Sequence, residues 1–229
     1  MPNHVRNVIK MQGITELPLF TTCDDGTKAF DFNKLIPMPK SLELEAGSLE
    51  DVAIEAALRK LGKGTTMSDE RYAERRKHYA KATDEELEKL GLQYISNSIL
   101  YGHTTWYHWC IENWDTKWNA YDNKTVNNGC IKFSTAWSSP EKVIEKLAEK
   151  YPEAKIEHWW ADEDTGNNTG YKAYENGRET ENSVGYFNNG SQEALNCYKF
   201  CWGKMPACFH KTADGQWTRH DCEGCTGCQ

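Results

Sequence analysis

Alternating apolar and polar residues predict β-strands in four segments. Residues 4–12 (HVRNVIKMQ) alternate loosely and stop at Gly13, whereas 130–137 follow a regular period of two. The regular series is Ile131, Phe133, Thr135 and Trp137. Side chains two positions apart share one face of a strand, so this spacing indicates a half-buried strand. Residues 155–161 and 170–175 are expected to form a hairpin around a loop rich in Gly and Asn.

Apolar residues three and four positions apart predict helices between the first two strands. The first helix is expected to begin at Ser48, because Asp51 three residues later suggests a capping box, and to end near Gly62. Its recurring apolar residues are Ala53, Ile54, Ala57, Leu58 and Leu61. A charged, exposed helix is predicted at 68–80. Thr83 and Glu86 are expected to cap the helix that follows.

Another helix is predicted after the strand at 130–137. Ser139 is its expected cap, Pro140 suits the first helical position, and Pro152 marks its end. The expected buried stripe is Val143, Ile144, Leu147 and Ala148. The order strand, helices, strand, helix, strand, strand predicts an α+β fold in which helices pack on one face of an antiparallel sheet.

Four segments resemble the YubB family of plasmid and phage proteins. They are Met1-Pro2-Asn3, 30–39 (FDFNKLIPMP), 109–120 (WCIENWDTKWNA) and 133–140 (FSTAWSSP). His4 departs from the family pattern, in which Trp commonly follows Met-Pro-Asn. The resemblance covers roughly residues 1–165 and implies a ferredoxin-like domain, a mobile-element setting and a bacterial cytoplasm. It implies no reaction.

The chain is therefore expected to have two parts. Residues 1–190 form a YubB-like α+β domain with a helical insertion at about 48–114, and residues 191–229 form a cysteine-rich tail. Six of the nine cysteines lie in that tail. The candidate metal ligands are Cys197, Cys201, Cys208, His210, His220, Cys222, Cys225 and Cys228.

The tail predicts a zinc site. Cys222 and Cys225 form a C-x-x-C knuckle, and Cys197 with Cys201 would face the same way on a helix, so that two pairs can make a tetrahedral thiolate site. A reducing cytoplasm favours metal over disulfides. Free thiols or disulfides are one alternative, and an iron–sulfur cluster is another because Cys222, Cys225 and Cys228 have C-x-x-C-x-x-C spacing. Zinc held by thiolates alone would be structural.

The stretch from Trp106 to Trp118 has aromatic residues at helical spacing. Its candidate residues are Trp106, Trp109, Glu112, Asn113, Trp114, Lys117 and Trp118. Core packing is one interpretation, because buried Trp needs a single partner for its indole N–H and the polar residues can satisfy backbone groups. A partner-binding pocket with aromatic walls is the other.

Composition limits the function classes. The 229 residues include 34 acidic and 27 basic ones, for a net charge of −7, so there is no general attraction to phosphate backbones. The sequence lacks Gly-rich phosphate loops and the hydrolase, zinc-protease and deaminase signatures. An enzyme would depend on a metal site at Asp162, Glu163 and Asp164, which are more typical of a solvated turn. With neither a long apolar run nor a leader pattern, we expect a soluble, cytoplasmic protein.

Three functions follow in order of preference. The first is a non-enzymatic inhibitor that binds a host protein, such as a component of anti-phage defence, through a surface rich in Trp, Tyr and Arg. The second is a zinc-containing nucleic-acid binder, for which the supporting surface would be Tyr171, Lys172, Tyr174, Arg178 and Tyr186. An enzyme comes third.

Overall fold

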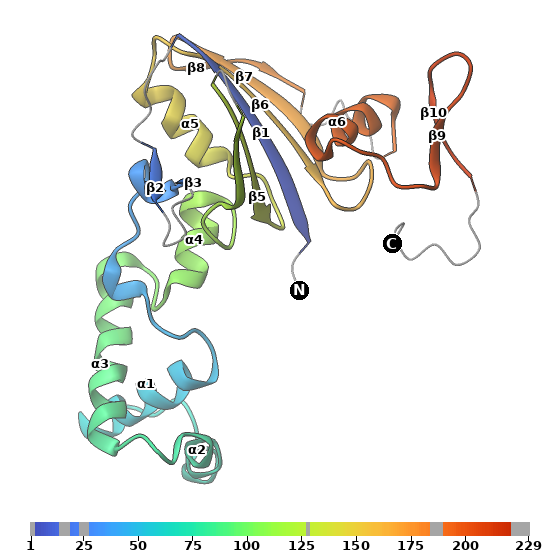
Figure 1. Cartoon of the computed structure of the whole chain (residues 1–229). Coiled ribbons are helices and arrows are strands. Elements are labelled where there is room, and N and C mark those ends of the chain that lie inside the picture. The colour runs from blue at the N-terminus through green and yellow to red at the C-terminus, as the bar shows by residue number, and fades with distance from the viewer. Residues whose placement is uncertain (1–2, 14–18, 23–27, 127–128, 184–189, 221–229) are drawn as a thin grey trace. The chain divides into compact units, whose positions relative to one another are not determined.

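Figure 1 shows a computed structural model of the chain, which describes residues 3–13, 19–22, 28–126, 129–183 and 190–220. The chain divides into two compact units. The sheet unit consists of Met1–Pro37 and Glu112–Gln229, and the helical unit consists of Met38–Ile111. The helical unit is thus inserted into the sequence of the sheet unit.

The sheet unit is built on six antiparallel strands in the order β4-β5-β1-β6-β7-β8. They are β1 (His4–Gln12), β4 (Tyr121–Val126), β5 (Cys130–Ala136), β6 (Lys155–Asp162), β7 (Thr169–Glu175) and β8 (Arg178–Asn182). With α4 (Trp106–Trp114) and α5 (Glu141–Lys150), the chain order is β1-α4-β4-β5-α5-β6. Those four strands lie in the order β6-β1-β5-β4, which is the ferredoxin-like arrangement. β7 and β8 extend the sheet beyond β6.

Helices lie on both faces of this sheet. On one face, Val8 of β1 packs with Ala161 of β6 and with Cys197 of α6 (Gln192–Trp202). On β7, Lys172 forms an ion pair of 2.7 Å with Glu141 of α5, and it lies opposite His158 in the β6–β7 register. Because His158 and Ala161 are an odd number of residues apart on β6, they point to opposite faces. The helices α5 and α6 therefore cover opposite faces, as Figure 1 shows.

The last residues of α4, which belong to the sheet unit, pack on the same face of the sheet as α5. The Trp114 ring lies 5.6 Å from the Phe32 ring, and Phe32 lies 5.9 Å from Phe133, which is opposite Asn7 in the sheet. The two ferredoxin-like helices thus lie on one face, as predicted. Residues 192–202, which were assigned to the cysteine-rich tail, instead form α6 and pack on the other face of the sheet.

Short elements complete the two units. They are β2 (Phe20–Thr22), β3 (Lys28–Phe30), β9 (Phe209–Lys211), β10 (Trp217–Arg219) and the 3-10 turns Phe32–Lys34, Lys40–Leu42 and Lys77–Tyr79. β2 pairs with β3, and β9 pairs with β10. None of the described helices is both long and apolar enough to cross a membrane.

The helical unit contains α1 (Ser48–Lys60), α2 (Asp69–Arg76) and α3 (Asp84–Tyr101). The capping box of Thr83 and Glu86 at the start of α3 is confirmed. The one predicted at Ser48 is wrong, because Gly47 is the N-cap of α1 and makes no side-chain cap bond. In the sheet unit, the predicted cap Ser139 likewise lies one residue before the N-cap of α5, which is Pro140.

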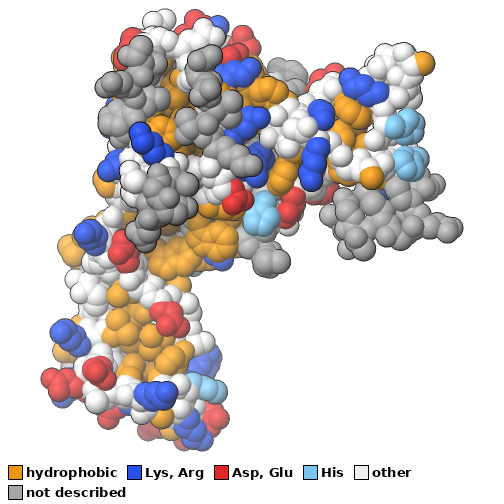
Figure 2. Space-filling view, viewed as in Figure 1, with side chains coloured by type: hydrophobic (Ala, Val, Ile, Leu, Met, Phe, Trp, Pro, Cys, Tyr) orange, Lys and Arg blue, Asp and Glu red, His pale blue; other side chains and the backbone are white. Residues whose placement is uncertain are grey.

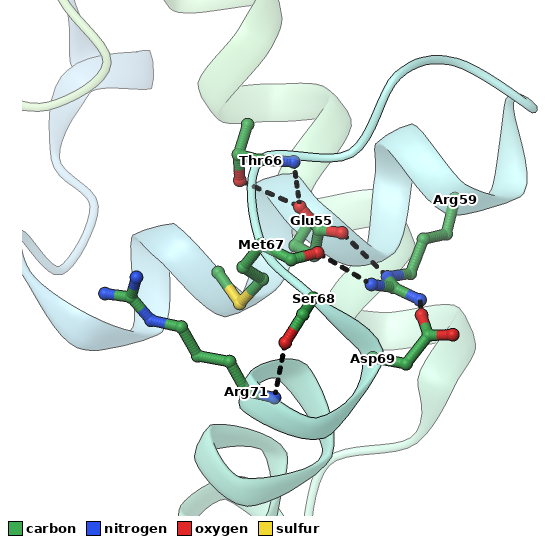
Figure 3. A network of polar contacts seen from close by, with 7 residues as sticks. All are labelled: Glu55, Arg59, Thr66, Met67, Ser68, Asp69 and Arg71. Atoms are coloured by element: carbon green, nitrogen blue, oxygen red, sulfur yellow. Dashed lines mark hydrogen bonds and ion pairs between the residues drawn. The ribbon is translucent and has the colours of Figure 1, made fainter.

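A buried carboxylate connects α1 to the start of α2 (Figure 3). Glu55 is fully buried and accepts hydrogen bonds from the Thr66 backbone N–H at 2.7 Å and from Arg59 Nε at 2.7 Å. Burial raises the pKa of Glu55, but the bonds from Thr66 and Arg59 outweigh it and leave that pKa below its usual value. The Arg59 guanidinium also forms an ion pair with Asp69. The Ser68 hydroxyl caps α2 by accepting a hydrogen bond from the Arg71 backbone N–H. The charged segment at 68–80 is thereby held to α1.

A candidate nucleic-acid interface on the sheet

Cations and aromatic rings lie together on the α6 face of the sheet. Arg6 and Lys10 are an even number of residues from Val8 on β1, and Lys132 of β5 lies directly opposite Val8, so all three share its face. The rings come from Trp159 of β6 and from Phe200 and Trp202 of α6. We call these residues the basic-aromatic track: Arg6, Lys10, Lys132, Trp159, Phe200 and Trp202.

Each cation of the track lies over an aromatic ring. The Lys10 ammonium is 4.9 Å from the centroid of the Trp159 ring and 5.0 Å from that of Phe200. The Lys132 ammonium is 5.9 Å from the Phe200 ring, and the Arg6 guanidinium is 5.4 Å from the Trp202 ring. Such contacts hold the long side chains along the apolar surface while their charges stay at the solvent.

The track is locally positive although the chain carries a net charge of −7. Within the part of the chain that the structure describes, Arg6, Lys10 and Lys132 form no ion pair. Glu157 lies opposite Lys10 in the β1–β6 register, and its carboxylate accepts from the Tyr171 hydroxyl at 3.3 Å. Figure 2 shows Lys and Arg side chains among hydrophobic ones over the sheet beside α6.

The predicted aromatic stretch is divided between the two units. Trp106, Trp109 and Cys110 belong to the helical unit, where the last two are buried. Burial raises the pKa of the Cys110 thiol to about 12, which does not suit a nucleophile. Trp114 is buried in the sheet unit, where its indole N–H donates to the Ile36 carbonyl at 2.9 Å. The buried Trp109 and Trp114 fit the core-packing interpretation, whereas Trp106 is half-buried.

The polar residues of the same stretch differ in how far they are exposed to solvent. Glu112 is exposed and its carbonyl accepts from the Lys142 ammonium at 2.6 Å, whereas Asn113 is half-buried. Lys117 lies 4.8 Å from the ring of Trp118, which is 37% exposed. Glu112, Lys117 and Trp118 are therefore accessible at the surface of the sheet unit, and Trp118 is the aromatic residue among them.

The structure separates the predicted zinc ligands. Cys197 and Cys201 are buried against the sheet, where the Cys197 thiol donates to the Trp160 carbonyl at 3.3 Å. A hydrogen bond from Cys201 lowers the pKa of Cys197, and burial raises that of Cys201. Both helix cysteines are thus core residues facing β6 and β1, and spacing alone did not reveal that their shared face is buried.

The remaining candidates lie on and beyond the β9–β10 hairpin. The rings of His210 and His220 are 5.5 Å apart. Cys208 is disulfide-bonded, and the other described cysteines are all free, so none of them is its partner. Cys222, Cys225 and Cys228 lie outside the described residues. Among the described residues, no group of three or more His, Cys, Asp or Glu side chains is placed to hold a metal ion.

Two other predicted sites have different roles in the structure. Asp162 is 5% exposed and accepts from the Asp164 backbone N–H at 2.9 Å and from Asn168 at 3.2 Å, so it builds the turn after β6. Burial raises its pKa. The residues that would have supported a nucleic-acid surface do not form one, because Lys172 and Tyr174 are buried on the α5 face. Tyr171 and Arg178 are accessible, and Tyr186 lies outside the described residues.

The family comparison corrects the predicted family assignment. A model of the ferredoxin-like domain in Api92-like protein matches residues 113–199. The YubB assignment is therefore wrong, and the ferredoxin-like fold that it implied is retained. The matched residues hold β4 to β8 and α5, whereas the central strand β1 comes from outside them.

Comparison with individual proteins adds one solved structure. The chain is similar to the crystal structure of a protein api92 from Yersinia pseudotuberculosis, with 10% identity and a TM-score of 0.36, covering 80% of this chain and 97% of that one. No curated protein matches the chain.

Proposed function

We propose that the sheet unit binds single-stranded nucleic acid through the basic-aromatic track. The supporting observation is the placement of Arg6, Lys10 and Lys132 over the rings of Trp159, Phe200 and Trp202 on one face of a sheet. Proteins that bind single strands combine a positive surface for the phosphates with aromatic side chains that stack on bases. Unpaired bases expose their faces for such stacking, whereas paired bases do not.

The charge of the chain sets the expected strength of this binding. Three cations can neutralise about three phosphates, which gives a slope of log affinity against log salt of roughly −2 for a single strand. The net charge of −7 adds long-range repulsion. Binding should therefore be weak at physiological salt and clear at low salt.

Charge reversal in the track is the direct test. Lys10→Glu with Lys132→Glu is expected to weaken binding of a fluorescent single-stranded oligonucleotide at least about tenfold at 50 mM salt, and to reduce the salt slope by about 1.4, because two of three phosphate contacts are lost. Fluorescence anisotropy across a salt series measures both quantities.

The matched control is Lys63→Glu with Lys81→Glu. Both lysines are exposed in the helical unit, and this pair changes the net charge by the same amount. The affinity of this control variant for the oligonucleotide should stay close to that of the wild type. Equal losses for the two double variants would mean that only overall charge matters, and the track would not be the binding surface.

Binding to a host protein is the second candidate. On α3 in the helical unit, Ile99 is 79% exposed and Leu100 is 66% exposed. Adjacent apolar side chains at a surface favour a protein contact. A tagged chain would be incubated with nuclease-treated bacterial lysate. A single stoichiometric protein captured by the wild type and lost with Ile99→Asp would favour this function, including inhibition of a defence component in the cytoplasm.

We also propose that zinc binds at the β9–β10 hairpin together with the cysteines beyond it. His210 and His220 offer two imidazoles from neighbouring positions, and zinc commonly takes mixed His and Cys ligands. Cys197 and Cys201 are excluded from this proposal by their burial against the sheet, and Cys208 can take part only when its disulfide is reduced.

Metal content tests the ligand set. Protein purified in reductant without added metal is expected to hold about one zinc per chain, as a tetrahedral site would. His210→Ala with His220→Ala should lose that zinc, whereas Cys197→Ser with Cys201→Ser should keep it. Emission spectrometry of the purified proteins gives the metal-to-chain ratio. Loss of zinc from the cysteine double variant would place the site in α6 instead.

A further inference from the structure

Two exposed tryptophans flank a lysine near the β1 start of the track. Trp118 is 37% exposed and Trp137 is 42% exposed. The Lys117 ammonium lies 4.8 Å from the ring of Trp118 and 4.9 Å from that of Trp137. Two large rings at the surface beside one cation form a compact aromatic site, which we call the Trp118–Trp137 pair.

We propose that the Trp118–Trp137 pair stacks on one unpaired nucleobase while Lys117 binds the adjoining phosphate. This inference rests on the proposed function and names the site where a base, as distinct from the backbone, is held. Trp has a large aromatic face for stacking, which every base can use, and a neighbouring ammonium complements the phosphate that each base carries with it.

The backbone at Trp137 supports a functional role. Its φ of 72° lies in the left-handed region, which a bulky side chain rarely adopts. The conformation is fixed on both sides, because the Trp137 N–H donates to the Asn3 carbonyl at 2.9 Å and the Asn168 amide donates to the Trp137 carbonyl at 3.0 Å. Strained residues held by their surroundings cluster at ligand sites. Here the strained residue is Trp137, whose aromatic ring is exposed.

The two tryptophans are also held relative to each other. The Thr116 hydroxyl donates to the Ala136 carbonyl at 2.8 Å, and the Ala136 N–H donates back to that hydroxyl at 3.1 Å. Thr116 is 1% exposed, so this reciprocal bond is shielded from water. Because these residues directly precede Lys117 and Trp137, the bond fixes the pair in advance of ligand binding, which reduces the entropy lost on binding.

Aromatic contacts connect the pair to the track. The Trp118 ring lies 6.2 Å from the ring of Tyr121, whose hydroxyl is 2.6 Å from His4 Nδ1. His4 and Arg6 are two residues apart on β1 and share the α6 face. From His4 to Lys10 the strand rises about 20 Å. One strand of nucleic acid can thus follow β1 and place a base at the pair.

The test compares two oligonucleotides of equal length, one with normal bases and one with abasic sites throughout. Trp137→Ala and Trp118→Ala are each expected to weaken binding of the base-bearing strand about tenfold and to leave the abasic strand unchanged. Trp137→Phe keeps a ring and should restore most of the affinity. Lys10→Glu with Lys132→Glu should weaken both strands. Anisotropy gives each affinity, and circular dichroism confirms that each variant is folded.

The outcomes separate this inference from the proposed function. Equal losses on both strands, or no loss on the base-bearing strand, would overturn the stacking site while leaving the track intact. No binding of either strand by the wild-type chain would overturn the proposed function and the stacking site together. Capture of a nuclease-resistant protein that is lost with Trp137→Ala would assign the pair to a protein contact and overturn the base site.

Discussion

Lowering the pH from 7 to 5 is expected to destabilise the sheet unit by about 2 kcal/mol through His158 alone. His158 is fully buried, and its Nε2 lies 3.0 Å from Asn7 Oδ1, so Nε2 carries the proton and donates. Its Nδ1 has no hydrogen-bond partner among the described residues. Burial, together with the charge of Lys172, lowers the pKa of His158 to about 3.

The direction follows from proton binding. In the unfolded chain a histidine takes up a proton below a pKa of about 6.5, whereas the folded protein does so only near 3. Between these values the unfolded state holds one more proton, so stability falls as the pH falls, by about 1.4 kcal/mol per pH unit. Holding the pH at 5 or above limits the contribution of carboxylates.

Urea unfolding followed by tryptophan fluorescence measures this effect. His158→Gln should be less stable than the wild type at pH 7, because its side chain fills less of the core, but its stability should change by about 2 kcal/mol less between pH 7 and pH 5. His78→Gln is the control, since His78 is exposed, and it should keep the wild-type pH dependence. Parallel profiles for wild type and His158→Gln would show that His158 is not the group responsible.

Gly91→Ala is expected to destabilise the helical unit by about 3 kcal/mol. A Cβ at Gly91 on α3 would lie 1.9 Å from the Ala53 carbonyl oxygen and 2.8 Å from the Ala57 Cβ on α1. The two helices would have to separate, because backbone atoms cannot move aside as a flexible side chain can. This cost exceeds the gain of about 1 kcal/mol that alanine has over glycine inside a helix.

Hydrogen exchange of the α1 and α3 amides in the full chain measures the stability of this unit directly. Gly64→Ala is the matched control, because it makes the same change in the same unit where nothing lies within 4 Å of the added Cβ. It should change protection little. Unaltered protection in Gly91→Ala would mean that the contact between α1 and α3 is looser than these distances indicate.

The sequence predicted the buried elements better than the edges of the sheet. Periods of two and of three to four residues identified β1, β5, β6, β7, α1, α3 and α5, because burial on one face imposes those periods, whereas the buried helix α6 fell in the predicted cysteine-rich tail. The two outer strands, β4 (YDNKTV) and β8 (RETEN), were missed. Edge strands need polar side chains to avoid pairing with other chains, so they lack the apolar alternation on which such predictions depend.

The track could not be seen in the sequence for a related reason. Arg6 and Lys10 lie more than a hundred residues from Lys132, and only the insertion of β1 between β5 and β6 brings them together. A search of the sequence for clustered basic residues therefore does not find the track. The left-handed conformation of Trp137 is equally invisible, since no residue type marks it. By contrast, the sequence did suggest Trp118 as a surface residue, because a partner-binding pocket was one of the two interpretations of the aromatic stretch.

The central position of β1 governs how the sheet unit can assemble during synthesis. β1 pairs with β5 through Arg6 and Ser134, and with β6 through Asn7 and Trp160. During synthesis β1 is therefore completed before its partners β5 and β6, which are encoded more than a hundred residues later. The helical unit is encoded between β1 and those partners and can fold before they are made. Its early folding would shorten the flexible chain between β1 and those partners, which lowers the entropy cost of their long-range pairing.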